Sequence, residues 1–516
     1  MASHKQVTRA AGVVGFATVI TRIFGFLRDM VIALSFGAGM EADAYFVAFR
    51  IPNMLRRLVG EGALTVAFIP VFVEERQKGE HNAWELANTV ATLLSLVLIV
   101  VTGVGILLSP WVIRVIAPGF THNPEKFALT TSLTRLMFPY IFFISLAALA
   151  MGMLNSLQHF FSPALAPLML NLTLIGSVLW LCPHLEQPAF GLAVGVLVGG
   201  AAQLLFQVPA LVKRGFRYRV NLEYTHPAVR KIGVLLLPAF FGLAVNQIAV
   251  FVNTLLASYL AEGSVSYLYF SYRVVEFPLG IFGMAVATAV LPTMSAQSAN
   301  GDYEQLIETL SFALRLVLFI TIPSMVGLIV LRMPIVAFLF QRGQFTVEAT
   351  QATAQALLYY TLGLFAIASV RIIVPVFYSL QDTMTPVKCA AGAVALNIVC
   401  SLLLMIPLQH GGLALATSLS AYFNLLLLVW VLRKRLGKIG WRRILRSLGK
   451  VTLASIVMGA CCAPFVGLAM QQIWVFLAVM AGGALVFLGC AWFLQSEEFA
   501  FLLELLVKRK GTESIP

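Results

Sequence analysis

The stretch Ala91–Leu108, ATLLSLVLIVVTGVGILL, decides the class of fold, because it runs for eighteen residues without one charged side chain. An α-helix needs about 20 predominantly apolar residues to cross the roughly 30 Å hydrocarbon core of a bilayer. Similar runs recur at Ile141–Leu154, Leu192–Leu211 and Ile473–Leu494. We therefore expect an all-α polytopic membrane protein.

The composition of the whole chain agrees with this expectation. Of its 516 residues, 60% are hydrophobic and only 11% are charged, whereas soluble domains carry about 25% charged residues. So few charges cannot cover a surface that faces water, which excludes a soluble enzyme. The six cysteines show no Cys-x-x-Cys spacing and no paired histidine, so we expect neither a disulfide framework nor a metal site.

Polar breaks divide the chain into about fourteen predicted membrane spans. The expected spans lie near 10–35, 42–73, 84–110, 128–155, 164–182, 189–212, 230–260, 266–296, 304–331, 348–379, 386–408, 411–433, 444–469 and 473–506. The net charge of +13 is concentrated in a few connections, at 213–231, 433–450 and 508–510. Because basic loops stay in the cytoplasm, we expect both termini to be cytoplasmic and attribute the charge to topology, not to nucleic-acid binding.

An internal repeat with an offset of 223 residues indicates two related lobes. Ser156-Leu157-Gln158 recurs as Ser379-Leu380-Gln381, and Phe49-Arg50 falls on Tyr272-Arg273. Each copy has six predicted spans, an even number, so the copies enter the membrane in the same sense, as in transporters built from parallel repeats. The predicted domains are an N-terminal lobe (1–213), an amphipathic cytoplasmic linker (214–229), a C-terminal lobe (230–435), an extra helix pair (443–508) and a cytoplasmic tail (509–516).

Ionisable residues inside predicted spans are the strongest functional signal. An arginine at the bilayer centre costs at least about 2.5–3.5 kcal/mol, so such residues usually face a cavity or an ionic partner. A packing role and a substrate role both remain open for four residues, because each has an opposite charge within a turn or two: Arg50, Arg57, Glu61 and Glu276. These intramembrane positions are Arg22, Arg28, Asp29, Asp43, Arg50, Arg56, Arg57, Glu61, Arg273 and Glu276.

Basic residues outnumber acidic ones on the spans 10–35, 42–73 and 266–296, which predicts a cationic cavity suited to an anionic substrate. Arginine is suited to phosphate because its planar guanidinium binds two oxygens at once and stays protonated when buried. Helix breakers lie beside these charges: Pro52-Asn53 is expected to interrupt the second span, and Pro278 follows Glu276. The sequence has no Walker A loop, no HExxH and no GxSxG, so we expect no ATP hydrolysis and no enzyme activity.

Several motifs together resemble the MurJ (MviN) family of lipid II flippases in the MOP transporter superfamily, and the resemblance covers essentially the whole chain. The motifs are Thr21-Arg22-Ile23-Phe24-Gly25-Phe26-Leu27-Arg28-Asp29, Phe36-Gly37-Ala38-Gly39 with Asp43-Ala44, Pro52-Asn53-Met54-Leu55-Arg56-Arg57 with Glu61-Gly62-Ala63, Arg273 with Glu276-Phe277-Pro278, and Gln381-Asp382 with Thr385-Pro386-Val387-Lys388.

The resemblance implies transport of undecaprenyl-pyrophosphate-linked disaccharide-pentapeptide from the cytoplasmic to the periplasmic leaflet. It also implies that Arg22, Arg28, Arg56 and Arg273 line a central cavity and that Asp43 is needed for function. From the charges and helix breakers of the spans, we predict supporting or counter-charge roles for Asp29, Asp43, Asn53, Arg57, Glu61 and Glu276. Some relatives have an aspartate where this chain has Tyr272, and Glu276 is a candidate to replace that charge.

The implied partners are lipid II and membrane lipids, without nucleic acid or ATP, and the protein is expected to act as a monomer in the bacterial inner membrane. No cofactor is expected. Coupling to the membrane potential or to a monovalent cation stays open, and no site for the cation is assigned. Two other functions remain as alternatives: a flippase for another polyprenyl-linked oligosaccharide of the O-antigen type, and a cation-coupled multidrug antiporter.

Overall fold

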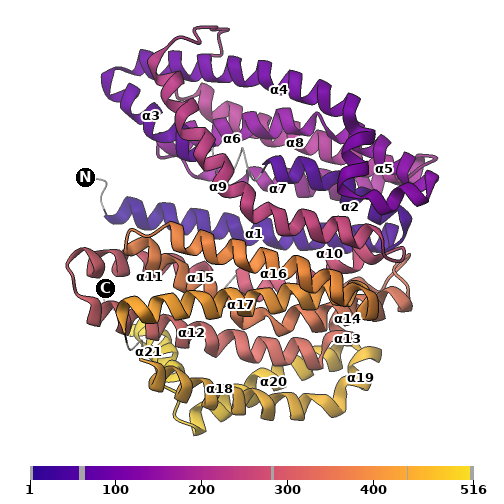
Figure 1. Cartoon of the computed structure of the whole chain (residues 1–516), viewed down its shortest axis with the longest axis vertical. Coiled ribbons are helices and arrows are strands. Elements are labelled where there is room, and N and C mark those ends of the chain that lie inside the picture. Colours follow the sequence, from indigo (N-terminus) through magenta and orange to yellow (C-terminus); the bar gives the residue numbers. More distant parts are fainter. Residues whose placement is uncertain (1–3, 57–63, 281–283, 438–439, 512–516) are drawn as a thin grey trace. The chain divides into compact units, whose positions relative to one another are not determined.

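The computed structural model describes residues 4–56, 64–280, 284–437 and 440–511, and in these residues the chain is helical with no β-strand. The first repeat begins with α1 (His4–Phe36), which is followed by a series of shorter and longer helices (Figure 1). These are α2 (Met40–Leu55), α3 (Leu64–Lys78), α4 (Glu80–Ile116), α5 (Pro124–Met137), α6 (Tyr140–Ser156), α7 (Phe161–Gly176) and α8 (Ala189–Val212).

The second repeat reproduces this series with nearly the same helix boundaries. Its members are α9 (Pro227–Ser258), α10 (Ser264–Pro278), α11 (Met284–Ala299), α12 (Tyr303–Val330), α13 (Arg332–Phe340), α14 (Val347–Leu362), α15 (Leu364–Ser379), α16 (Met384–Leu408) and α17 (His410–Leu436). Most starts and ends lie within three residues of the predicted offset of 223. There are two exceptions: the long α4, whose counterpart is divided into α12 and α13, and α7, which ends earlier than its counterpart α16. The repeat inferred from short motifs therefore extends through the whole series.

The repeated Ser-Leu-Gln motif ends a helix in the same way in both copies. Gln158 and Gln381 both take a left-handed backbone conformation, with φ of 57° and 59°. In the first copy the amide of His159 donates to the carbonyl of Leu154 at 2.9 Å; in the second, the amide of Asp382 donates to Phe377 at 2.8 Å. This is the hydrogen-bond pattern of a Schellman cap, which satisfies carbonyl groups left open at a helix end.

Four helices follow the second repeat: α18 (Trp441–Cys462), α19 (Val466–Gln471), α20 (Ile473–Phe493) and α21 (Glu497–Gly511). Of these helices, α18 packs on α20 and also on α12 of the second repeat (Figure 1). The prediction of one span over 473–506 was wrong, because α20 ends at Phe493. A further left-handed glutamine, Gln495, caps the helix there, and α21 starts with its own acidic first turn.

The expected break at Pro52-Asn53 was also wrong. Pro52 lies inside α2, which continues to Leu55, so the helix tolerates the proline. Proline removes one backbone donor and crowds the preceding turn, but these effects do not end α2. The predicted span 42–73 is built instead from α2 and α3, and residues 57–63 between them lie outside the described residues.

Nine helices or helix runs of the described chain are long and apolar enough to cross a membrane, and ten if α14 and α15, which meet at a bend of 42°, count as one span. They correspond to the predicted spans near 84–110, 128–155, 164–182, 189–212, 304–331, 386–408, 411–433 and 444–469, and to the first part of 473–506. The protein is therefore a polytopic membrane protein, while the count of fourteen stays a prediction.

The chain forms two compact units. Unit 1 comprises Met1–Ser266 with Gly343–Phe345, and unit 2 comprises Tyr267–Arg342 with Thr346–Pro516. The first helix of the second repeat, α9, belongs to unit 1 because it packs on α3 and α4. This division differs from the predicted lobe boundaries at 213 and 230, which remain predictions about the repeats.

Two glycines explain why Gly343–Phe345 belongs to unit 1. Gly37, at the end of α1, has φ of +60°, and a Cβ there would lie 2.3 Å from the carbonyl oxygen of Gln344. Gly343 has φ of +58°, and a Cβ there would lie 2.3 Å from the carbonyl oxygen of Leu34. Because both positions lack a side chain, the amide of Gln344 reaches the Leu34 carbonyl at 2.9 Å.

Candidate functional site

Arg28, one of the predicted substrate-binding arginines, lies in a buried polar cluster between α1 and α7. It donates from Nε and Nη2 to Oδ1 of Asp29, at 3.0 and 2.7 Å, and from Nη1 to Oδ1 of Asn171 at 3.1 Å. Asn171 in turn donates from Nδ2 to the carbonyl oxygen of Thr21 at 3.1 Å. The exposed fractions are 9% for Arg28, 0% for Asp29 and 5% for Asn171.

This cluster solves the problem that the sequence raised for a charged residue inside a span. A buried charge is tolerated when an opposite charge and further hydrogen bonds replace its water shell. Asp29 supplies the opposite charge and Asn171 a neutral acceptor for the buried Arg28 guanidinium. Asp29, which the sequence predicts as a counter-charge, lies next to the Arg28 guanidinium, and its role in transport stays a prediction.

Asp43 lies in a second buried cluster, at the start of α2. Its Oδ2 accepts from Nζ of Lys126 at 2.7 Å and from the amide of Gly263 at 2.8 Å. Its Oδ1 accepts from the amide of Ser266 at 2.9 Å and from the Ser266 hydroxyl at 2.7 Å. Asp43 is 1% exposed and Lys126 is 6% exposed. This carboxylate therefore ties α2 to α5 and to the start of α10.

In both repeats the side chain at one equivalent position accepts a hydrogen bond from an arginine three residues away. In α2, Arg56 donates from Nε to Oδ1 of Asn53 at 3.1 Å. In α10, Arg273 donates from Nη1 to Oε2 of Glu276 at 2.9 Å, and both side chains are about one-third exposed. Asn53 and Glu276 are separated by the repeat offset. Glu276 thus supplies a carboxylate for Arg273, although Tyr272 stands where some relatives have an acid.

The predicted arginines are therefore not all in one environment. Arg22 is half-buried on α1, Arg28 is buried in its cluster, and Arg56 is half-buried on α2, all in unit 1, whereas Arg273 belongs to unit 2. Their convergence on one cavity stays a prediction. Arg57 and Glu61 lie outside the described residues.

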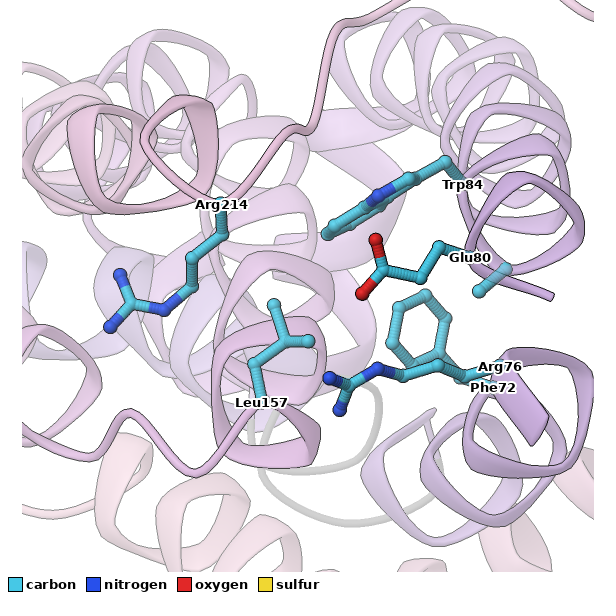
Figure 2. Close-up of a pocket in the computed structure, with 7 residues that line it drawn as sticks. Phe72, Arg76, Glu80, Trp84, Leu157 and Arg214 are labelled. Atoms are coloured by element: carbon cyan, nitrogen blue, oxygen red, sulfur yellow. The ribbon is translucent and has the colours of Figure 1, made fainter.

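A separate cavity of about 260 Å³ lies within unit 1, where α3 ends and α4 begins. Figure 2 shows Trp84, Glu80 and Phe72 around it, with the guanidinium of Arg214 pointing away from Glu80. Arg214 bonds instead to the Ala210 carbonyl and to Nδ1 of His159. Burial and the neighbouring Arg214 charge lower the pKa of His159. Because its lining carries both signs of charge and none of the predicted substrate-binding residues, this cavity is not the predicted cationic site.

The segment after the first repeat is docked along α4. Asn88 donates from Nδ2 to the Arg217 carbonyl at 3.2 Å and accepts from the Arg219 amide at 3.0 Å. Thr92 accepts from the Asn221 amide at 3.3 Å. Most of the predicted linker 214–229 is therefore a non-helical strip that docks on α4, and its last residues belong to α9, which starts at Pro227.

Sequence reasoning missed three residues that organise the clusters: Asn171, Lys126 and Ser266. For Ser266 a signal existed, because it is the equivalent of Asp43 at the repeat offset of 223. Asn171 had a weaker signal, as a lone polar residue in a predicted span, and Lys126, in the connection between two predicted spans, had none. Groups of three or more His, Cys, Asp or Glu side chains that could hold a metal ion are absent from the described part of the chain.

Comparison with solved structures first defines the class of protein. An inward-facing multidrug resistance MATE family transporter of the MOP superfamily has a TM-score of 0.68 at 15% identity, covering 84% of this chain and 99% of that chain. At this identity the likeness shows the fold alone. This chain therefore shares the polytopic helical fold of that structure.

Closer likenesses identify the family. A lipid II flippase MurJ in an inward closed conformation has a TM-score of 0.80 at 28% identity, covering 93% of this chain and 98% of that chain. A probable lipid II flippase MurJ from Vibrio cholerae is 39% identical over 432 residues, 82% of each chain. A lipid II flippase MurJ from Burkholderia cenocepacia is 37% identical, covering 83% of this chain and 84% of that protein. The family model for lipid II flippase MurJ matches residues 32–482. This chain belongs to the lipid II flippase MurJ family, as its motifs predicted.

Proposed function

We propose that this chain is a lipid II flippase of the bacterial inner membrane, which moves the polyprenyl-pyrophosphate-linked peptidoglycan precursor from the cytoplasmic to the periplasmic leaflet. The match to the lipid II flippase MurJ family over residues 32–482 carries this proposal. The polytopic helical fold supports it, because a flippase must shield a polar headgroup within the bilayer. Both termini are cytoplasmic in this proposal, since the basic connections would then face the cytoplasm.

Arg22, Arg28, Arg56 and Arg273 are the proposed contacts for the pyrophosphate. Guanidinium groups suit this task because they bind phosphate oxygens in pairs and remain charged at low dielectric. Arg28, Arg56 and Arg273 each have a nearby oxygen partner on the protein, so each guanidinium is oriented before substrate arrives. Binding then spends less entropy on ordering these side chains.

No chemical bond changes in the proposed process, and no cofactor is required. The membrane potential could supply work, since moving one charge through 100 mV changes the free energy by about 2.3 kcal/mol. Asp382, which belongs to one of the family-like motifs, has a carboxylate that accepts from Thr385 and pairs with Arg435. Hydrogen bonds from Thr385 lower the pKa of Asp382, so it is ionised near neutral pH.

The test is to measure lipid II that is accessible from the periplasm in cells depleted of their own flippase. We expect expression of this chain to restore exposure and Arg28→Ala, at equal membrane abundance, to abolish it. A well-expressed native chain that restores no exposure would contradict the proposal and favour another polyprenyl-linked oligosaccharide. Restoration by both proteins would keep the flippase and remove Arg28 from its site.

A further inference from the structure

Asn171 is a buried amide that joins α7 to α1 through both ends of its side chain. Arginine only donates hydrogen bonds and a backbone carbonyl only accepts them. The Asn171 oxygen must therefore face Arg28 and its nitrogen must face the Thr21 carbonyl, as observed. Both bonds of this amide cross to α1, so its orientation is fixed by chemistry without the ambiguity usual for asparagine.

Asp29, the second partner of Arg28, cannot fix the position of the guanidinium relative to another helix. Asp29 is the next residue along α1, so it moves with Arg28 whenever α1 moves. Asn171 is 143 positions away in sequence and reaches Arg28 from a different helix. Asn171 thus orients the guanidinium relative to another helix of unit 1.

The repeat shows that the fold does not need this cluster. At the offset of 223 residues, the positions of Arg28, Asp29 and Asn171 are taken by Phe251, Val252 and Val394. The helices α9 and α16 form with these apolar residues. Replacing a buried ion pair by apolar residues of similar volume is often neutral or stabilising. A buried polar cluster kept in one repeat alone therefore points to a role other than folding.

We infer that Asn171 is a positioning residue, which holds the Arg28 guanidinium in the orientation that recognises a pyrophosphate. This inference rests on the proposed function. Binding sites keep their geometry when the contacting side chain is locked by neighbours that do not touch the ligand themselves. Loss of the Asn171 contact leaves the Arg28 charge in place but lets its side chain take other rotamers. Pyrophosphate affinity should then fall while contacts with the apolar tail stay unchanged.

The experiment measures binding of two probes to the purified full-length protein: undecaprenyl pyrophosphate and uncharged undecaprenol. We expect the native chain to prefer the pyrophosphate. Asn171→Val introduces the residue found in the second repeat, and the isosteric Asn171→Asp keeps an acceptor for Arg28 but loses the donor to Thr21. Each should weaken pyrophosphate binding about tenfold, the effect of roughly one charged hydrogen bond, and leave undecaprenol binding unchanged.

Gln207→Leu is the matched control. Gln207 is 1% exposed in the same unit and donates from Nε2 to the Ala147 carbonyl of α6 at 3.0 Å, without a contact to Arg28. Its loss should lower Tm without changing the preference for pyrophosphate. In an Arg28→Gln background, Asn171→Val should have no further effect on pyrophosphate binding, because Asn171 acts through Arg28.

The outcomes separate the two proposals. If both Asn171 variants keep pyrophosphate affinity within about twofold, or lose undecaprenol affinity equally, the positioning role is wrong and the flippase proposal stands. The same holds if Asn171→Val still weakens binding in the Arg28→Gln background. A native chain that binds both probes equally would overturn the pyrophosphate site and, with it, this inference.

Discussion

The two repeats of this chain share a series of helices but differ in what they bury. The first repeat holds Arg28, Asp29 and Asn171 in one polar cluster, whereas the second has Phe251, Val252 and Val394 at the equivalent positions. Apolar patterning and helix caps are enough to reproduce the helix boundaries in both copies. Buried charge is therefore an addition to the common architecture, and its presence in one copy marks a functional difference.

The repeats also differ in what packs against their long helices. In the first repeat α4 holds the strip after α8 through Asn88 and Thr92. In the second repeat, Arg315 of α12 occupies the position equivalent to Thr92 and pairs with Glu497 and Glu498 at the start of α21. In each copy this position thus contacts a later part of the chain, through a neutral hydrogen bond in the first repeat and through an ion pair in the second.

The largest expected effect comes from making the first repeat resemble the second. We expect the triple change Arg28→Phe, Asn171→Val and Asp29→Val to give a folded protein whose stability is equal to or above the native value by up to about 4 kcal/mol, since no charge is left unpaired. Lipid II exposure should be lost completely. Thermal unfolding of the purified protein and the exposure assay test the two halves of this prediction. A triple variant that still flips lipid II would show that the cluster is structural.

Asp43 and Ser266 occupy equivalent positions in the two repeats and contact each other. Substituting each in turn tests how much each side chain contributes to stability. Asp43→Ser removes the acceptor of Lys126 and leaves a buried cation. We expect the free energy of unfolding to fall by about 3–5 kcal/mol, whereas Ser266→Ala, which removes one hydroxyl donor, should cost about 1–2 kcal/mol. Denaturation of both variants under the same conditions measures the difference. Equal losses would show that Lys126 finds another partner.

A smaller loss of stability is expected when a contact of the strip that follows the first repeat is removed. Asn88→Ala removes one donor and one acceptor that bind the backbone of Arg217 and Arg219. We expect a loss of about 1–3 kcal/mol, confined to the strip. Hydrogen exchange should become faster at residues 217–221 and stay unchanged in α12. Unchanged exchange in the strip would mean that Phe216 and Trp84, whose rings are 5.6 Å apart, hold it without Asn88.

The smallest effect is expected at the exposed pair of Lys231 and Glu74, which joins the first helix of the second repeat to α3. Both side chains are about half exposed, and solvent screens such pairs. Lys231→Gln should leave Tm unchanged within measurement error, at low and at high salt. A clear drop in Tm would show that α9 depends on this ion pair and not on its apolar contacts with α3 and α4.

Much of this protein was predictable because its signals are local. Long apolar runs predicted membrane helices, and several predicted spans agree with the helices to within a few residues, as at 189–212. The Ser-Leu-Gln motif revealed the repeat. It is a local signal, because each copy caps a helix through hydrogen bonds that span no more than five residues. The failures at 42–73 and 473–506 have a local origin too, since a tolerated proline and a left-handed glutamine do not show in hydropathy.

The sequence by itself determined the fold class, the repeat, the family and which charged residues lie inside apolar helices. Only the tertiary structure decided how those charges are paired. Arg28 meets Asn171 and Asp43 meets Lys126 and Ser266, at separations of 143, 83 and 223 residues. No local pattern encodes such pairs, because they form only when helices distant in sequence pack side by side. Burial then makes the pairing obligatory, since a charge in an apolar layer must find its partner within the protein.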